Sequence, residues 1–440
     1  MTLDVPPTLA VDPLLDDPKT RIIVCCGAGG VGKTTTAAAL GLRAAERGRK
    51  VVVLTIDPAR RLAQSMGIDS LDNTPRRVKE IEGDGELHAM MLDMKRTFDE
   101  IVEAHADAER ARAILENPFY QSLSAGFAGT QEYMAMEKLG QLRARDEWDL
   151  IVVDTPPSRS ALDFLDAPSR LGSFLDGKFI RVLMAPAKVG GRAGMKFLNV
   201  GMSMMTGTLG KLLGGPFLKD VQTFVAAMDT MFGGFRTRAD ATYRLLQAPG
   251  TAFLVVAAPE RDALREAAYF VERLAADRMP LAGLVLNRVH GSGAARLSAE
   301  RALAAAEALG APDGPVENHE TGGIVDQEGG KEEVRTPPEP LDSPETPASS
   351  TDSASDSPTA ESDGTDLPAA AELTAGLLRL HAERMRLLSR EQRTRDRFTA
   401  LHPEVAVAEV AALPGDVHDL AGLRDIGHRL ATGGRPAEAV

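Results

Sequence analysis

The chain has 440 residues, of which 43% are hydrophobic, enough to bury one large core or two ordinary ones. This length excludes a miniprotein held together by disulfides. The net charge of −13 comes from one segment, because residues 311–368 carry 15 Asp or Glu against only Lys331 and Arg335. The balanced remainder argues against a strongly basic nucleic-acid-binding protein, so we expect no nucleic-acid partner.

The only two cysteines, Cys25 and Cys26, are adjacent within an apolar run and cannot form a disulfide framework or a spaced zinc site. We interpret both as residues of a strand core. No stretch approaches the length of an apolar membrane span, and residues 1–20 lack the basic start and apolar centre of a secretory signal. We therefore expect a soluble, cytoplasmic protein that is not an integral membrane protein.

The order of elements begins after a Pro-containing start. Residues 1–20 hold four prolines and few large apolar side chains, which predicts a flexible N-terminal arm. The pattern then predicts a buried strand over 21–26, a glycine turn over 27–32, an Ala-rich helix over 33–47 and a second strand over 50–56. This order predicts a βαβ unit in a parallel sheet.

Further apolar strands are predicted over 150–153, 251–258 and 281–287, with helical patterns between them, notably over 260–277. The alternation predicts an α/β fold with a doubly wound, mainly parallel sheet. Residues 171–235 are rich in Gly and Met, and we interpret them as a separate helical insertion. Methionine can adapt to an apolar client helix, although it also fills irregular cores.

The acidic segment 311–368 holds 9 of the 27 prolines and few large apolar residues, which predicts disorder. We expect order to resume at Ala369, with a helix through about Leu401. A last strand over 404–413 precedes a Pro-Gly turn.

Residues 27–34, Gly-Ala-Gly-Gly-Val-Gly-Lys-Thr, satisfy two templates, G-x-x-x-x-G-K-T and G-x-G-x-x-G. The second would bind a dinucleotide, and Asp57 stands near the expected place of its acidic ribose ligand. Lys33 and Thr34 favour a triphosphate, because an ammonium suits the β- and γ-phosphates and a hydroxyl suits Mg²⁺. Backbone N–H groups of residues 29–33 and the positive end of the following helix would hold the phosphates.

Asp154 follows the apolar run 150–153. Besides the Thr34 hydroxyl, a triphosphate site needs a carboxylate on the metal side, and Asp154 supplies it through a bridging water.

We expect adenine as the base. Guanine-binding proteins place an Asp three residues after the Asn of an Asn-Lys-x-Asp run, whereas His290 stands three residues after Asn287. Asn287 could alternatively be a turn residue at a strand end.

Three stretches, 27–35, 55–59 (Thr-Ile-Asp-Pro-Ala) and 154–158 (Asp-Thr-Pro-Pro-Ser), together resemble the arsenite-pump ATPase family. That family includes the cytosolic ATPase that targets tail-anchored membrane proteins. The resemblance implies a P-loop ATPase domain over 21–310 and 369–430, with Lys33 and Asp57 as catalytic residues. Asp57 would orient the attacking water, although it could instead cap the backbone of its own segment.

The resemblance also assigns the remaining site residues. ATP contacts are expected from Gly27, Gly29, Gly30, Val31, Gly32, Lys33, Thr34, Thr35, Asn287 and Pro414. Mg²⁺ contacts are expected from Thr34 and Asp154. The two switch segments comprise Asp57, Pro58, Asp154, Thr155, Pro156 and Ser158.

Three departures from the family matter. Ala28 stands where the family has a lysine that reaches the partner subunit's phosphates, so we expect either a homodimer or a heterodimer with a lysine-bearing paralogue. The cysteines that bind metalloid in arsenite-sensing members are missing, which argues against arsenite transport. The Cys-x-x-Cys that holds the bridging zinc of the targeting dimer is missing too, so we expect any dimer to be held by other contacts. The resemblance leaves a membrane-protein or other hydrophobic client as the expected cargo, and a low-turnover scaffold subunit as the alternative.

Overall fold

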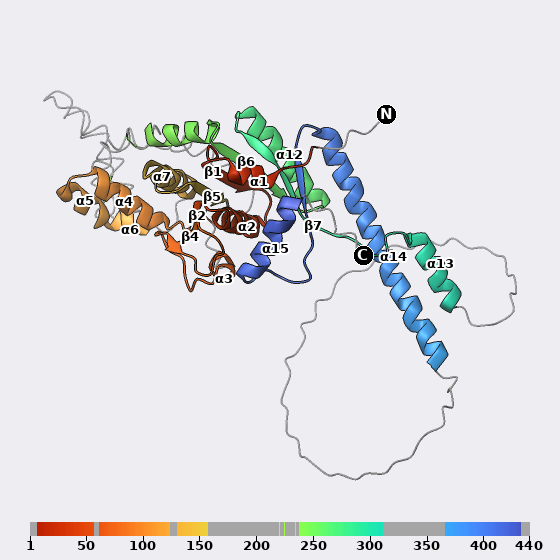
Figure 1. The fold of residues 1–440 in the computed structure, drawn as a ribbon. Helices are drawn as coiled ribbons and strands as arrows, with labels where there is room; N and C mark the ends of the chain where they lie inside the picture. Colours follow the sequence, from red (N-terminus) through yellow and green to blue (C-terminus); the bar gives the residue numbers. More distant parts are fainter. Residues whose placement is uncertain are drawn as a thin grey trace, which may run out of the picture. The chain divides into compact units, whose positions relative to one another are not determined.

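The computed structural model describes residues 7–56, 61–123, 130–156, 237–310 and 366–432, together with Asp220, Phe224 and Gly234 (Figure 1). Two compact units divide the chain: Met1–Gly293 with Leu387–Val440, and Ala294–Arg386. The strands are β1 (Ile22–Cys26), β2 (Lys50–Thr55), β3 (Arg76–Arg77), β4 (Glu86–Met91), β5 (Leu150–Asp154), β6 (Thr251–Ala257), β7 (Leu281–Val289) and β8 (Val407–Ala411). The helices are α1 (Val11–Asp16), α2 (Lys33–Glu46), α3 (Arg61–Ser65), α4 (Met94–His105), α5 (Ala108–Leu115), α6 (Pro118–Leu123), α7 (Thr130–Ala144), α12 (Arg261–Ala276), α13 (Ala299–Gly310), α14 (Asp366–Leu401) and α15 (Leu420–Thr432).

One sheet of eight strands organises the first unit, in the order β3-β4-β2-β5-β1-β6-β7-β8. Every neighbouring pair is parallel except β3 with β4. β1 lies between β5 and β6, so the chain winds away from it in both directions. The predicted doubly wound α/β fold is confirmed.

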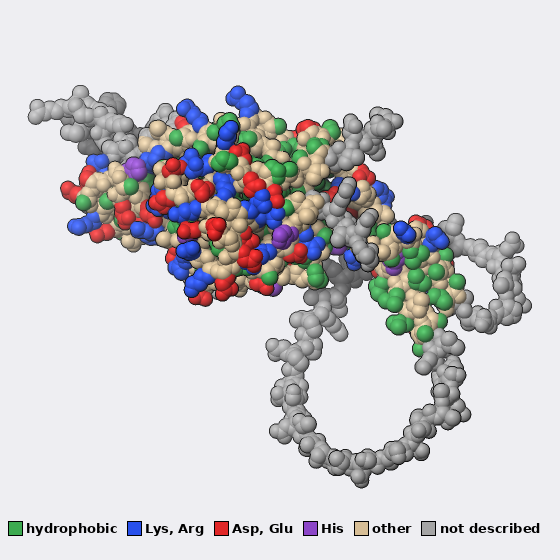
Figure 2. Space-filling view, viewed as in Figure 1, with side chains coloured by type: hydrophobic (Ala, Val, Ile, Leu, Met, Phe, Trp, Pro, Cys, Tyr) green, Lys and Arg blue, Asp and Glu red, His purple; other side chains and the backbone are tan. Residues whose placement is uncertain are grey.

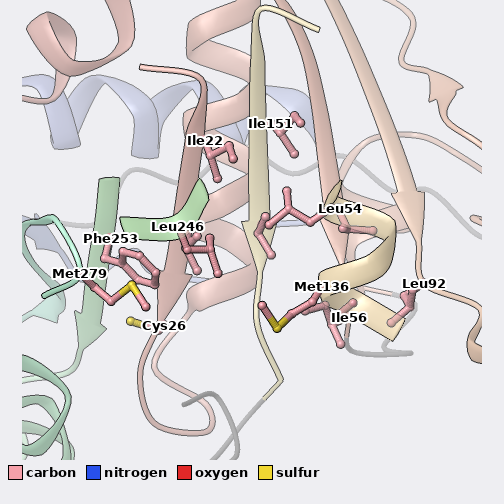
Figure 3. Packing of buried hydrophobic residues seen from close by; sticks show 14 of the residues in the cluster. Ile22, Cys26, Leu54, Ile56, Leu92, Met136, Ile151, Leu246, Phe253 and Met279 are labelled. Carbon is pink, nitrogen blue, oxygen red and sulfur yellow. The ribbon is translucent and has the colours of Figure 1, made fainter. Parts of the chain in front are cut away.

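Both faces of the sheet are buried, which explains why its central strands are continuous apolar runs. In β1, Ile22, Val24 and Cys26 belong to one core, whereas Ile23 and Cys25 belong to the other. Residues of α4, α7 and α12 complete the first core, and residues of α1, α2 and α15 complete the second. Figure 3 shows side chains of the first core projecting from neighbouring strands. The interpretation of both cysteines as strand core is confirmed.

The N-terminal segment differs from its prediction. Leu9, Val11 and Leu15 are buried in the second core, and Arg43 of α2 donates to Asp12 over 2.5 Å. The prediction of a flexible arm over residues 1–20 is therefore wrong for the part that the structure describes, from residue 7 onward. The few apolar side chains suffice because the six-residue helix α1 turns Val11 and Leu15 toward the sheet, and Asp12 between them pairs with Arg43 of α2.

Two strands were not predicted, and one boundary shifts. β4 was missed because it alternates between the cores, with Leu87 in one and Met90 in the other, instead of forming an apolar run. α14 begins at Asp366, three residues before the predicted resumption at Ala369.

Most of the predicted insertion 171–235 and of the acidic segment 311–368 lies outside the described residues. Among the described positions of the insertion, Phe224 is buried in the first core and stacks on Tyr120 of α6, with ring centroids 5.9 Å apart.

The second unit contains α13 and the first part of α14. These helices pack through Ala302 and Ala382, and His381 donates from Nε2 to the carbonyl of Leu297 over 2.8 Å.

On the face of the molecule drawn in Figure 2, basic and acidic side chains are interspersed, with no broad basic patch. Within the described ranges, no helix has the length and apolar composition needed to span a membrane.

Candidate functional site

The loop between β1 and α2 needs glycine at particular positions. Gly27, Gly30 and Gly32 have positive φ values of 146°, 76° and 95°. A Cβ at Gly27 would lie 2.0 Å from the carbonyl oxygen of Val256 in β6, so no other residue fits without moving the strand. Gly29 and Gly30 form the exposed tip of the loop. Such a glycine-rich turn at a helix N-terminus is suited to an anion, because backbone N–H groups and the helix dipole both favour negative charge.

Lys33 is the first residue of α2 and only 6% exposed. Its Nζ donates to the carbonyl oxygen of Ala28 over 2.7 Å, so the ammonium lies against the loop itself. Lys33 therefore brings a buried cation to the base of the glycine loop.

Asp154 is fully buried at the end of β5, beside the end of β1. Its Oδ2 accepts hydrogen bonds from Thr34 Oγ1 at 2.7 Å and from Thr55 Oγ1 at 2.9 Å. The parallel register explains the convergence, since Asp154 pairs with Cys25 of β1 and with Thr55 of β2. Hydroxyl and carboxylate oxygens are the ligands that Mg²⁺ prefers, so this donor set fits the expected metal.

The predicted switch segments are only partly described. Thr155 is buried, and its hydroxyl donates to the carbonyl of Cys25 over 2.9 Å, while Pro156 is half-buried. Asp57, Pro58 and Ser158 lie outside the described residues. The residue before Asp57 is held from α7, because Gln131 Nε2 donates to the carbonyl of Ile56 over 2.9 Å.

A cavity of about 650 Å³ opens beside the loop. The predicted residues Thr35, Asn287 and Pro414 all line it, although they come from three distant parts of the chain. Asn287 is 9% exposed and donates from Nδ2 to the carbonyl of Val31, a buried loop residue, over 2.8 Å. The volume falls within the range of small-molecule sites, roughly 300–1,000 Å³.

The sequence prediction missed three polar residues at the site. Thr55 could have been found, since it is the first residue of the stretch 55–59, which resembles the family's first switch, and carries a hydroxyl at the end of a strand. His290 and Glu391 also line the cavity and contact each other across 101 residues of sequence. Glu391 had no local signal, because it stands within a long helix rich in charged residues.

A parallel sheet whose first strand leads through a glycine loop into a helix beginning Lys-Thr, with an aspartate at the end of the neighbouring strand, defines a P-loop nucleotide-binding fold. A family model described as anion-transporting ATPase matches residues 20–295. The chain belongs to this family, which removes the dinucleotide interpretation of the loop.

Several curated proteins are similar to this chain. ATPase GET3 of Malassezia globosa is 32% identical over 166 residues, which is 38% of this chain and 47% of the relative. A putative arsenical pump-driving ATPase of Halobacterium salinarum is 31% identical over 184 residues, 39% of this chain and 27% of the relative. ATPase GET3 of Podospora anserina is 25% identical over 278 residues, 63% of this chain and 75% of the relative. The chain thus spans less than half the length of the first two of these relatives.

Proposed function

We propose that this chain binds ATP with Mg²⁺ at the loop of residues 27–35 and hydrolyses it. The observation that carries the proposal is the hydrogen bond between Thr34 and Asp154 at the end of a glycine loop whose backbone also binds the Lys33 ammonium. The Thr34 and Asp154 oxygens can bind a metal ion, and Lys33 supplies a cation, at the end of one glycine loop. This combination is typical of triphosphate sites, whereas a loop that binds the pyrophosphate of a dinucleotide needs neither feature. Membership of an ATPase family supports the same reaction.

Each residue has a proposed task in binding. Backbone N–H groups of residues 29–33 would donate to phosphate oxygens, and Lys33 would exchange the Ala28 carbonyl for the β- and γ-phosphates. Thr34 and Asp154 would hold Mg²⁺, the latter through water; the ion neutralises phosphate charge when bound. By the family resemblance, Asp57 would orient the water that attacks the γ-phosphate.

We further propose that hydrolysis works as a switch in a cytoplasmic dimer that handles a membrane-protein or other apolar client. ATP would shift the dimer between two subunit arrangements, because the two switch segments would contact the γ-phosphate better in one arrangement than in the other. Support comes from relatives named ATPase GET3 and arsenical pump-driving ATPase. Arsenite itself is not the proposed cargo, because Cys25 and Cys26 are buried in the sheet and soft thiolate ligands are what that ion needs.

A second candidate is a low-turnover, ATP-binding scaffold subunit that regulates a lysine-bearing paralogue. Ala28 favours it, because this residue replaces the family's trans-acting lysine and is itself 9% exposed among core residues. Such a subunit would bind ATP at the same loop but would need a partner to reach full activity.

The proposed site is tested by Lys33→Ala, measured by calorimetry with ATP and Mg²⁺. We expect affinity to fall about 100-fold or more, roughly 2.7 kcal/mol, since a charge-assisted contact to phosphate is lost. Lys95→Ala is the matched control, because Lys95 is an exposed lysine of α4 that pairs with Asp99. Circular dichroism verifies that both variants are folded. Unchanged ATP binding by the folded Lys33→Ala variant would refute the assignment.

A further inference from the structure

The cavity beside the loop contains an acidic side chain that the proposed function does not use. Glu391 belongs to α14, is 9% exposed and lines the cavity together with Asn287 and Pro414. Its helix is held against the sheet nearby, since Arg395 donates to Glu409 of β8 over 2.5 Å and Phe398 is buried in the first core. The helix therefore holds Glu391 at a fixed place in the cavity wall.

The two oxygens of Glu391 are in different situations. Oε1 accepts a hydrogen bond from Nδ1 of His290 at 2.6 Å. Oε2 is buried and has no hydrogen-bond partner among the residues that the structure describes. Buried polar atoms are nearly always paired, so an unpaired acceptor on a side chain that lines a cavity points to a donor on a ligand.

We propose that Glu391 selects the base of the bound nucleotide, accepting a hydrogen bond at Oε2 from the exocyclic amine of adenine. This inference rests on the proposed function, because it assumes a nucleotide whose phosphates lie at the loop. The edge of adenine carries an N–H₂ donor at position 6, whereas guanine carries an oxygen acceptor there. A carboxylate facing that position attracts the first base and repels the second.

The His290 contact explains why Glu391 does not read guanine instead. Guanine can present its N1–H and N2–H donors side by side, which calls for both oxygens of one carboxylate. In this cavity His290 already donates to Oε1 and leaves a single oxygen for the base. His290 is thus a positioning residue, because it leaves Glu391 able to accept only one hydrogen bond from the base.

The test compares the affinities of ATP, GTP and inosine triphosphate, each with Mg²⁺, by calorimetry on the full chain. We expect the wild-type chain to prefer ATP over both others, and to bind GTP and inosine triphosphate alike, because both carry an oxygen at position 6. In Glu391→Gln we expect the ATP:GTP preference to fall about 10- to 100-fold, since an amide can rotate to donate to that oxygen. Glu383→Gln, at an exposed position of the same helix, is the control and should keep the wild-type preference.

His290 provides a second, independent variant. His290→Asn can still offer an N–H to Oε1 and should keep the preference for ATP, whereas His290→Ala should lose part of it. A wild-type preference for GTP, or an unchanged preference in Glu391→Gln, would overturn the inference while leaving ATP binding at the loop intact. Absence of binding of any of the three nucleotides to the wild-type chain would instead refute the proposed function.

Discussion

Cys26 shows how burial in the sheet changes the chemistry of one side chain. It ends β1, is 1% exposed, and lies in the first core in Figure 3. Burial raises the pKa of its thiol from the usual 9.0 to about 12, and burial also raises the pKa of Cys25. Both thiols therefore stay protonated in the folded protein at neutral pH, which makes them poor nucleophiles and poor metal ligands.

The raised pKa of Cys26 predicts a loss of stability in alkali. Above pH 9 the unfolded chain releases the thiol proton while the folded chain keeps it, so the stabilisation present below pH 9 is lost as the pH rises toward 12. One such group lowers the free energy of unfolding by about 1.4 kcal/mol per pH unit. The free energy of unfolding, measured by urea unfolding at several pH values between 9 and 11, should fall less steeply with pH in Cys26→Ala than in the wild type, by about this amount.

Val24→Ala is the matched control for this measurement, because Val24 occupies the same strand and the same core without a titratable group. It should lower stability at every pH and keep the wild-type slope. An equally steep slope in Cys26→Ala would mean that the thiol does not titrate differently in the folded and unfolded chains.

At the scale of elements, the N-terminal segment is a structural part of the sheet domain. Arg49, 9% exposed, donates to the carbonyl oxygens of Leu15 at 2.8 Å and Thr20 at 2.6 Å. The same side chain also donates to the carbonyl of Asp149 at 2.5 Å, so it ties α1 and the following turn to the approach of β5. A guanidinium suits this task because it has several N–H donors in a rigid plane.

Truncation of Leu15 tests how much α1 contributes. Leu15 is fully buried, so Leu15→Ala should lower the free energy of unfolding by about 2–5 kcal/mol, as large-to-small changes in cores do. Leu14→Ala, at the half-buried neighbouring position, should cost clearly less. If residues 7–20 behaved as a loose arm, urea unfolding would place both variants within about 0.5 kcal/mol of the wild type.

At the scale of the whole molecule, the proposed dimer implies a test of which subunit supplies a cation to the nucleotide. Ala28 brings no side-chain cation to the loop, and its carbonyl is bound to Lys33 of the same chain. If a paralogue supplies the missing lysine in trans, ATP turnover of the purified chain alone should be low. Mixing with such a paralogue should raise it by about 10³-fold, the magnitude known for cations delivered in trans to phosphoryl transfer.

This turnover experiment separates the two proposed functions. Steady-state phosphate release is measured for the chain alone, for the paralogue alone and for the mixture. An activity of the chain alone that equals the activity of the mixture would contradict the heterodimer and favour a self-sufficient homodimer. The Lys33→Ala variant of this chain, added to the paralogue, shows whether the nucleotide bound by this subunit is the one that is hydrolysed.

The sequence alone determined the local features of this protein. β1, the glycine loop and α2 could be predicted because their signals are contiguous: an apolar run buried on both faces, glycines where the backbone needs positive φ, and an Ala-rich helix. The doubly wound class followed from the alternation of such runs. The same locality explains the error at the N-terminus, where scattered Leu9, Val11 and Leu15 became core only by packing on the sheet.

Tertiary structure decided which distant residues share one site. The parallel register brings Asp154 to Thr34 and Thr55, because the ends of adjacent parallel strands meet at one edge of the sheet. The pairing of Glu391 with His290 depends on how α14 packs against β8, which no spacing in the sequence encodes. Side-chain chemistry and local backbone preference are written in neighbouring residues, whereas the composition of a cavity depends on contacts between segments far apart in the chain.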